Sequence, residues 1–91
     1  MIEILKIFAE FDKFMTPEKK KQNNLEGQIH LFIEITRFKG YEEKYPNMEP
    51  PFSIYIKECE DKLEFVKQHE DLSFHEASLL FEENQNENEN L

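Results

Sequence analysis

The chain has 91 residues, a formal net charge of −9, one cysteine and nine phenylalanines. A chain of this length forms one domain with one modest core, which excludes an enzyme built from separate cofactor and substrate domains. No apolar run approaches the roughly 18 residues that cross a bilayer. The charges within the first fifteen residues exclude a secretory signal, and the single Cys59 excludes a disulfide framework. We therefore expect a cytoplasmic protein.

The negative charge is concentrated in the second half of the chain. Residues 1–41 hold 7 basic and 6 acidic side chains, a net of +1, whereas residues 42–91 hold 4 basic and 14 acidic, a net of −10. A field of this sign repels nucleic-acid phosphates and anionic membranes, and it attracts basic protein surfaces. The only basic cluster, Lys19 to Lys21, is typical of a solvated turn. We expect a protein partner with a basic surface, and neither nucleic acid nor a membrane.

Residues 1–15 are predicted to form an amphipathic helix, because apolar residues recur there at spacings of three and four. The Thr16–Pro17 pair ends this helix and is also suited to cap a second one, with Thr16 at the N-cap. Residues 18–24 contain no apolar side chain, which indicates either a solvated turn or a frayed helical segment. The recurring apolar residues are Met1, Ile4, Leu5, Phe8, Phe11, Phe14 and Met15.

The middle of the chain favours strands. Apolar residues alternate with other residues over 28–38, which predicts a strand, although a helix is the alternative because Leu25, Ile29 and Phe32 share a helical face. Residues 40–51 contain three prolines and predict a long loop. A second strand is expected over 52–57.

Residues 63–66 indicate a short third strand. The alternative for this region is a helix over 57–69, with Cys59, Leu63 and Val66 on one face.

The last predicted element is a helix over 74–84, because Ser73 and Glu76 form a capping box in front of an apolar series. Residues 1–84 are expected to form one globular domain, and residues 85–91 a disordered acidic and Asn-rich tail. The element order α-β-β-β-α predicts a small α+β domain, with two helices packed on a three-stranded antiparallel sheet. A mostly α fold is the alternative.

The sequence offers no motif for catalysis, a metal or a cofactor. His69 and His75 are six residues apart, outside the usual zinc spacings. His75 begins an H-E-x-x-H pattern, but Leu79 stands where the second histidine is required. The acidic neighbours of Cys59 are expected to raise the pKa of its thiol, which disfavours a nucleophile. We expect a protein that is not an enzyme and that carries no cofactor.

Two hypotheses for the function follow. In the first, the acidic half docks on a basic surface of a nucleic-acid-binding protein, as an inhibitor or nucleic-acid mimic of the kind that viruses and mobile elements use against host defences. Its contact residues are Glu42, Glu43, Glu49, Glu58, Glu60, Asp61, Glu64, Glu70 and Asp71. In the alternative, the protein is an interaction module or homodimer that uses apolar contacts of the first helix and the 41–51 loop. Its contact residues are Phe8, Phe11, Tyr41, Tyr45 and Met48.

Overall fold

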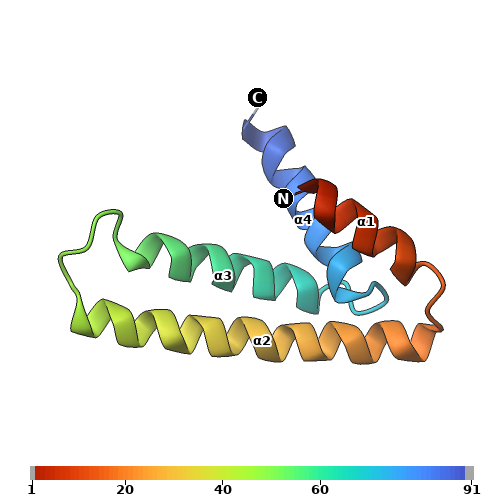
Figure 1. Ribbon diagram of the computed structural model, residues 1–91, viewed down its shortest axis with the longest axis horizontal. Helices are drawn as coiled ribbons and strands as arrows, with labels where there is room; N and C mark the ends of the chain where they lie inside the picture. Colours follow the sequence, from red (N-terminus) through yellow and green to blue (C-terminus); the bar gives the residue numbers. More distant parts are fainter. Residues whose placement is uncertain (1, 90–91) are drawn as a thin grey trace.

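The computed structural model describes the backbone of residues 2–89 and the side chains of residues 2–85 (Figure 1). The described backbone forms four helices and no strand. The α+β prediction with a three-stranded sheet is therefore wrong, and the mostly α alternative is correct. None of the described helices is long and apolar enough to cross a membrane. The helices are α1 (Ile2–Asp12), α2 (Pro17–Lys44), α3 (Phe52–Lys67) and α4 (Phe74–Glu89).

Helix α2 begins at the predicted Thr16–Pro17 cap. The Thr16 hydroxyl accepts a hydrogen bond from the backbone N–H of Lys19 at 3.2 Å, and Pro17 lies in the first turn, where its missing N–H leaves no donor unpaired. Residues 18–24 form the first turns of this helix, so the helical alternative for that segment is the correct one.

The strand predicted over 28–38 is wrong, because this segment lies inside α2. Its apolar residues occupy two sides of the helix: Leu31 and Ile35 are buried, whereas Ile29, Phe32 and Ile33 are exposed. Apolar residues on two sides of a helix produce the same alternation in sequence as a half-buried strand. Spacings of three and four occur on both sides: the buried side consists of Asn24, Gly27, Leu31 and Ile35, and the exposed side includes Leu25, Ile29 and Phe32.

The strands predicted over 52–57 and 63–66 are also wrong, because both lie inside α3. The helical alternative over 57–69 is correct in type, but the helix begins earlier, at Phe52. Its inward residues again recur at spacings of three and four: Ile56, Cys59, Leu63 and Val66.

The predicted loop over 40–51 is shorter than expected, because α2 continues to Lys44 and leaves 45–51 as the connection.

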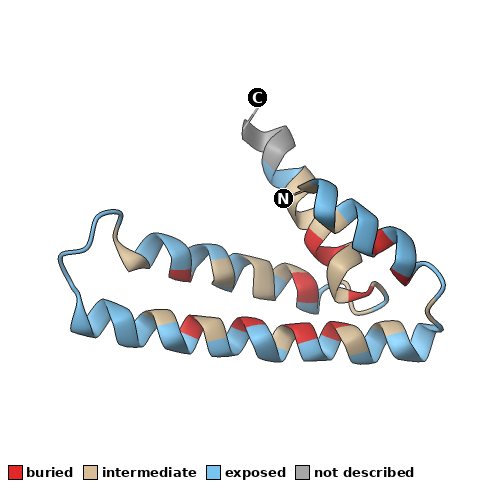
Figure 2. Cartoon of the chain, in the orientation of Figure 1, coloured by how far each residue is buried: buried red, intermediate tan, exposed pale blue. Residues whose placement is uncertain are grey.

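Helices α2 and α3 form a long antiparallel hairpin (Figure 1). Helices α1 and α4 pair with each other and lie over the end of the hairpin where α2 begins and α3 ends, so the opposite end projects freely. The core lies where the hairpin meets α4: Leu31, Val66 and Ala77 are buried there, with Leu63, Leu72 and Phe74 packed around them. Figure 2 shows buried segments along α2 and α3 as well as in α1 and α4.

A buried amide attaches the end of α3 to α2. Asn24 is fully buried, and its Nδ2 lies 3.2, 3.0 and 3.1 Å from the carbonyl oxygens of Val66, His69 and Leu72. Its Oδ1 accepts a hydrogen bond from Gln28 Nε2 at 2.7 Å. The last carbonyls of a helix have no hydrogen-bond partners within the helix. The Asn24 side chain of α2 supplies a donor to one carbonyl at the end of α3 and to two carbonyls of the turn that follows it.

The start of α4 is fixed by hydrogen bonds from three parts of the chain. The predicted capping box is confirmed, because the Ser73 N–H donates to Glu76 Oε1 at 2.9 Å and the Glu76 N–H donates to Ser73 Oγ at 3.1 Å. The N–H of Phe74 donates to Asn23 Oδ1 of α2 at 2.8 Å. The Asp12 carboxylate of α1 accepts a hydrogen bond from Ser73 Oγ at 2.7 Å.

The helix α4 extends to Glu89 and so enters the 85–91 segment for which the sequence predicts a disordered tail. Residues 90 and 91 lie outside the described part of the chain.

Candidate protein interfaces

Helix α1 carries an exposed apolar stripe, which we call the α1 stripe and define as Ile4, Ile7, Phe8, Phe11 and Phe14. Phe11 is 68% exposed and Phe14, just past the helix end, is 89% exposed; the other three are between 46% and 56% exposed. At about 100° per residue, positions 4, 7, 8 and 11 lie on one side of the helix.

The opposite side of α1 packs against α4. Ala9 and Asp12 are the buried residues of α1, at 8% and 6% exposure. The Asp12 carboxylate also lies 2.9 Å from His75 Nδ1. At the edge of the α1 stripe, the His75 ring stacks on the partly exposed Phe8 with 4.9 Å between ring centroids. These contacts fix the rotation of α1, so its most apolar side faces away from the core.

A second apolar stripe runs along the outer side of α2 and borders a groove of about 450 Å³ against α3. The α3 side of this groove is formed by Leu63 and Lys67. The exposed members of this stripe are Leu25, Ile29, Phe32 and Ile33.

The free end of the hairpin holds a third apolar surface, an open pocket of about 420 Å³ that we call the tip pocket. The sequence-predicted Tyr41, Tyr45 and Met48 are brought together there, each 41–49% exposed. Phe38 of α2 and Phe52 of α3 complete the lining. Phe8 and Phe11 lie on α1, so the alternative set of contact residues divides between two separate surfaces.

The nine predicted carboxylates do not form one patch. Glu42, Glu43 and Glu49 lie around the free end of the hairpin, Glu58, Glu60, Asp61 and Glu64 lie along α3, and Glu70 and Asp71 lie in the turn that follows α3. Glu60 pairs with Lys39 at 3.8 Å and Asp61 pairs with Lys57 at 3.5 Å. Glu70 accepts a hydrogen bond from Gln28 at 3.4 Å.

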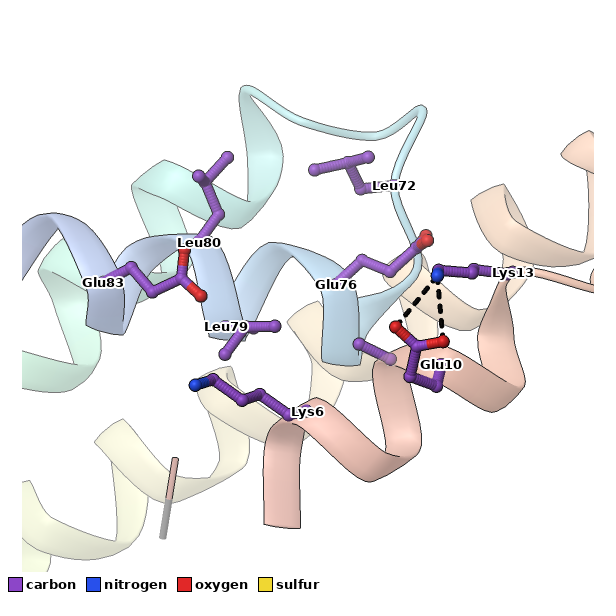
Figure 3. A pocket seen from close by; sticks show the side chains of 9 residues that line it. Lys6, Glu10, Lys13, Leu72, Glu76, Leu79, Leu80 and Glu83 are labelled. Atoms are coloured by element: carbon purple, nitrogen blue, oxygen red, sulfur yellow. Dashed lines mark hydrogen bonds and ion pairs between the residues drawn. The ribbon is translucent and has the colours of Figure 1, made fainter. Parts of the chain in front are cut away.

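A shallow groove of about 380 Å³ lies between α1 and α4 (Figure 3). Its apolar lining comes mainly from Leu72, Leu79 and Leu80, and charged side chains of both signs surround it. Lys13 and Glu10 at its edge pair with each other at 2.8 Å. The mixed charge gives this groove no preference for a ligand of either sign.

Asp12, Ser73 and His75 are the residue types of a hydrolase triad, but their order is different. The Asp12 carboxylate stands between the other two, 2.7 Å from Ser73 Oγ and 2.9 Å from His75 Nδ1. In a triad the imidazole lies between the serine and the aspartate, because it must accept the serine proton. Ser73 is also fully buried. This cluster joins α1 to α4 and is not arranged for nucleophilic attack.

A second histidine, His69, is also held by local contacts. His69 Nδ1 lies 2.8 Å from the Phe65 carbonyl oxygen, and its ring stacks on Phe65 at 4.2 Å. Burial raises the pKa of the Cys59 thiol, and the Glu34 and Glu58 carboxylates add to this rise against the opposing charge of Lys62. The predicted direction is confirmed, although burial is the largest cause. Among the described residues, no three His, Cys, Asp or Glu side chains are placed to hold a metal ion.

The raised pKa of Cys59 predicts slow alkylation. At pH 8 the native protein should react with iodoacetamide more slowly than the urea-unfolded chain, because a smaller fraction of the thiol is ionised. The pH–rate profile of the native protein should also lie at higher pH than that of the unfolded chain. Because folding raises this pKa, the neutral thiol favours the folded state at lower pH, and the effect is lost as the pH rises through the folded pKa. A faster native reaction would contradict the assignment.

Two groups of interface residues are absent from the sequence prediction. The apolar stripe of α2 was not predicted as an interface, because the alternating pattern of its segment favours a strand over 28–38. Phe38 belongs to a helical series with Tyr41 and Tyr45, at spacings of three and four, and this signal is visible only once the segment is read as a helix.

No protein-family model matches the chain, and neither a curated protein nor a solved structure is significantly similar to it.

Proposed function

We propose that this protein is an assembly module without a catalytic role, which pairs with a second copy of itself through the α1 stripe. The observation that carries the proposal is the exposure of that stripe: four large apolar residues of one short helix and Phe14 just past its end are 46–89% exposed. Contiguous apolar surface of this kind marks an interaction site in soluble proteins, since single scattered residues are the norm.

The burial of these residues is a substantial source of free energy. Covering a phenylalanine or isoleucine side chain completely is worth about 1.5–3 kcal/mol. A two-fold dimer covers the same stripe on both copies, so each residue contributes twice. The described core has only six buried hydrophobic residues, which are Ala9, Leu31, Ile35, Ile56, Val66 and Ala77. A dimer through α1 therefore adds apolar burial that the small core lacks.

The size and shape of the chain support a partner. Its accessible surface is 6738 Å², whereas a compact monomer of this mass exposes about 5,600 Å². Its radius of gyration is 14.5 Å, against about 12 Å for a compact chain of this length. The chain is therefore more extended than a compact monomer of its size and leaves more surface open to a partner.

The charge of the region around α1 permits contact between two copies of this surface. The first 41 residues, which include α1, carry a net charge of +1, whereas the rest of the chain carries −10. Residues 1–15 hold two basic and three acidic side chains, a net of −1, so two copies that meet through α1 bring nearly neutral helices together. Like charges in contact would cost several kcal/mol.

Phe11→Glu is expected to convert the dimer into a monomer. A two-fold interface loses two phenylalanines, each worth about 2 kcal/mol, so the dissociation constant should rise about 1,000-fold. Sedimentation velocity at about 1–100 µM protein measures this change, because this range spans a typical dimer equilibrium. Because Phe11 is largely exposed in the monomer, its substitution should leave the helical circular dichroism spectrum unchanged.

The matched control is Ile54→Glu, which places the same charge on a residue of α3 that is 54% exposed. This variant should remain dimeric. A wild-type protein that is monomeric at the highest concentration would refute the proposal, as would dissociation caused by Ile54→Glu and not by Phe11→Glu.

The nucleic-acid-mimic hypothesis stays a prediction. Binding through carboxylates weakens steeply as salt is added, because the contacts are ionic. An interface built from the α1 stripe should persist from about 0.1 to 1 M NaCl, since hydrophobic burial is not screened. The same sedimentation experiment at the two salt concentrations separates the two kinds of contact.

A further inference from the structure

The tip pocket lies at the end of the hairpin remote from α1, where the chain is covered by no other helix (Figures 1 and 2). Its five lining residues present only apolar surface to a volume of about 420 Å³. Binding sites for ligands and peptide anchors are commonly concave, mostly apolar and of this size. The pocket is independent of the dimer proposed above.

Ring contacts hold three of the five lining residues, Phe38, Tyr41 and Phe52, in place, so this part of the pocket is preformed. The Phe52 ring lies 6.2 Å from the Phe38 ring and 5.7 Å from the Tyr41 ring, and the Tyr55 ring stacks on Phe38 at 5.9 Å. The backbone N–H of Tyr45 donates to the Tyr41 carbonyl at 2.7 Å, which fixes the first residue of the loop. A preformed site needs little ordering when a ligand binds, and this raises affinity.

Acidic residues stand next to the lining residues in the sequence, and we call these three carboxylates the rim. Glu42 and Glu43 follow Tyr41, and Glu49 follows Met48. All three are exposed, and none of them forms an ion pair or a side-chain hydrogen bond within the described part of the chain. Lys44 is the one basic residue of 41–51, and its Nζ lies 5.5 Å from the centroid of the Tyr45 ring. A ligand in the pocket therefore meets an apolar floor, with the unpaired carboxylates of the rim on neighbouring residues.

We propose that the tip pocket binds a segment of a partner protein in which a large apolar side chain is flanked by lysine or arginine. The apolar residue enters the pocket, where tyrosine, methionine and phenylalanine are the residue types enriched in interface cores. The flanking cations meet the carboxylates of the rim, which adds electrostatic complementarity and a faster association. Nucleic acid is disfavoured because the same carboxylates repel phosphate.

The test is a selection from a displayed library of random 12-residue peptides against the immobilised full-length protein. Enriched peptides should share an aromatic or long aliphatic residue within a few positions of lysine or arginine. Affinities of the enriched peptides are then measured by fluorescence anisotropy on the wild type and on two variants. The pocket variant is Tyr45→Ser with Met48→Ser, and the rim variant is Glu42→Gln, Glu43→Gln and Glu49→Gln.

We expect the pocket variant to weaken binding at least about 30-fold, as the loss of a central anchor site does, and the rim variant to weaken it about tenfold. The control removes three negative charges elsewhere, by Glu58→Gln, Glu64→Gln and Asp71→Asn, and should change the affinity less than about twofold. The substituted residues are all exposed, so each variant should keep its helical spectrum.

Three results would overturn the proposal: no enrichment at all, enrichment of peptides without basic residues, or equal weakening by the rim variant and the control. The last result would mean that net charge alone attracts the peptides. The measurements are repeated on Phe11→Glu. Retained peptide binding by that variant supports the proposed independence of the two surfaces, and a failure of dimerisation alone leaves the result for the tip pocket intact.

Discussion

Asn24→Asp should lower the free energy of unfolding by about 4 kcal/mol and the melting temperature by about 20 °C or more. The substitution keeps the shape of the side chain and replaces its NH₂ group with an oxygen. That oxygen would face the carbonyl oxygens of Val66, His69 and Leu72, all within 3.2 Å of the present nitrogen. A fully buried carboxylate opposite three carbonyls loses its hydration and gains no donor there.

Two further variants isolate the cause. Asn24→Ala removes the same hydrogen bonds without adding a charge, so its cost should be smaller, about 2–3 kcal/mol. Asn84→Asp makes the identical chemical change at an exposed position of α4, and its effect should stay within about 0.5 kcal/mol. Urea unfolding followed by circular dichroism measures all three. An Asn24→Asp protein as stable as the wild type would mean that Asn24 does not hold the end of α3.

Gly27→Ala should destabilise the protein by about 2 kcal/mol, although alanine is the better helix former. Gly27 is buried on the inner side of α2, and the Phe74 side chain lies directly against it. A β-carbon added at Gly27 would stand 2.8 Å from Phe74 Cβ and would overlap the ring. The Phe74 side chain begins at the backbone of α4, so the strain can be relieved only by moving that helix.

Gly40→Ala is the matched control on the same helix. Nothing lies within 4 Å of a β-carbon added at Gly40, so the helix propensity of alanine should appear unopposed, as a gain of up to about 1 kcal/mol. Thermal unfolding of the two variants should therefore shift in opposite directions. If Gly27→Ala is also stabilising, Phe74 does not rest on Gly27 in solution.

These two residues also determine where the α1 stripe points. Asn24 places the turn before α4, and Gly27 allows Phe74 to approach α2 closely. Helix α1 is in turn attached to the start of α4 through Asp12. A variant that loosens this junction should weaken the proposed dimer as well as the fold, which is why Phe11, outside the junction, is the better test of the interface.

Local chemistry in the sequence determined the ends of several elements. The Thr16–Pro17 pair begins α2, and the reciprocal hydrogen bonds of Ser73 and Glu76 begin α4, as predicted. Such caps involve residues only three or four positions apart and need no distant partner, so the local amino-acid sequence specifies them. The uneven charge is likewise a property of the sequence alone. The sequence also places the acidic residues of the rim next to Tyr41 and Met48.

Tertiary contacts decided what the alternating segments become. The series Ile29, Leu31, Ile33 and Ile35 fits a strand with one buried face or a helix with apolar residues on two sides, and the choice depends on what packs against it. Val66 and Ala77 meet Leu31 from two other helices, and Asn24 reaches the carbonyls at the end of α3. These partners lie more than thirty residues away, so no local pattern contains them.

The direction of the α1 stripe was decided in the same way. The sequence identifies α1 as amphipathic, and the ordinary expectation is that the most apolar side of such a helix faces the core. In the folded chain α4 packs instead against Ala9 and Asp12, because a small residue permits close approach and the carboxylate bonds Ser73 and His75. The sequence alone therefore determined that α1 is an amphipathic helix, and only the tertiary structure decided that its phenylalanines face solvent.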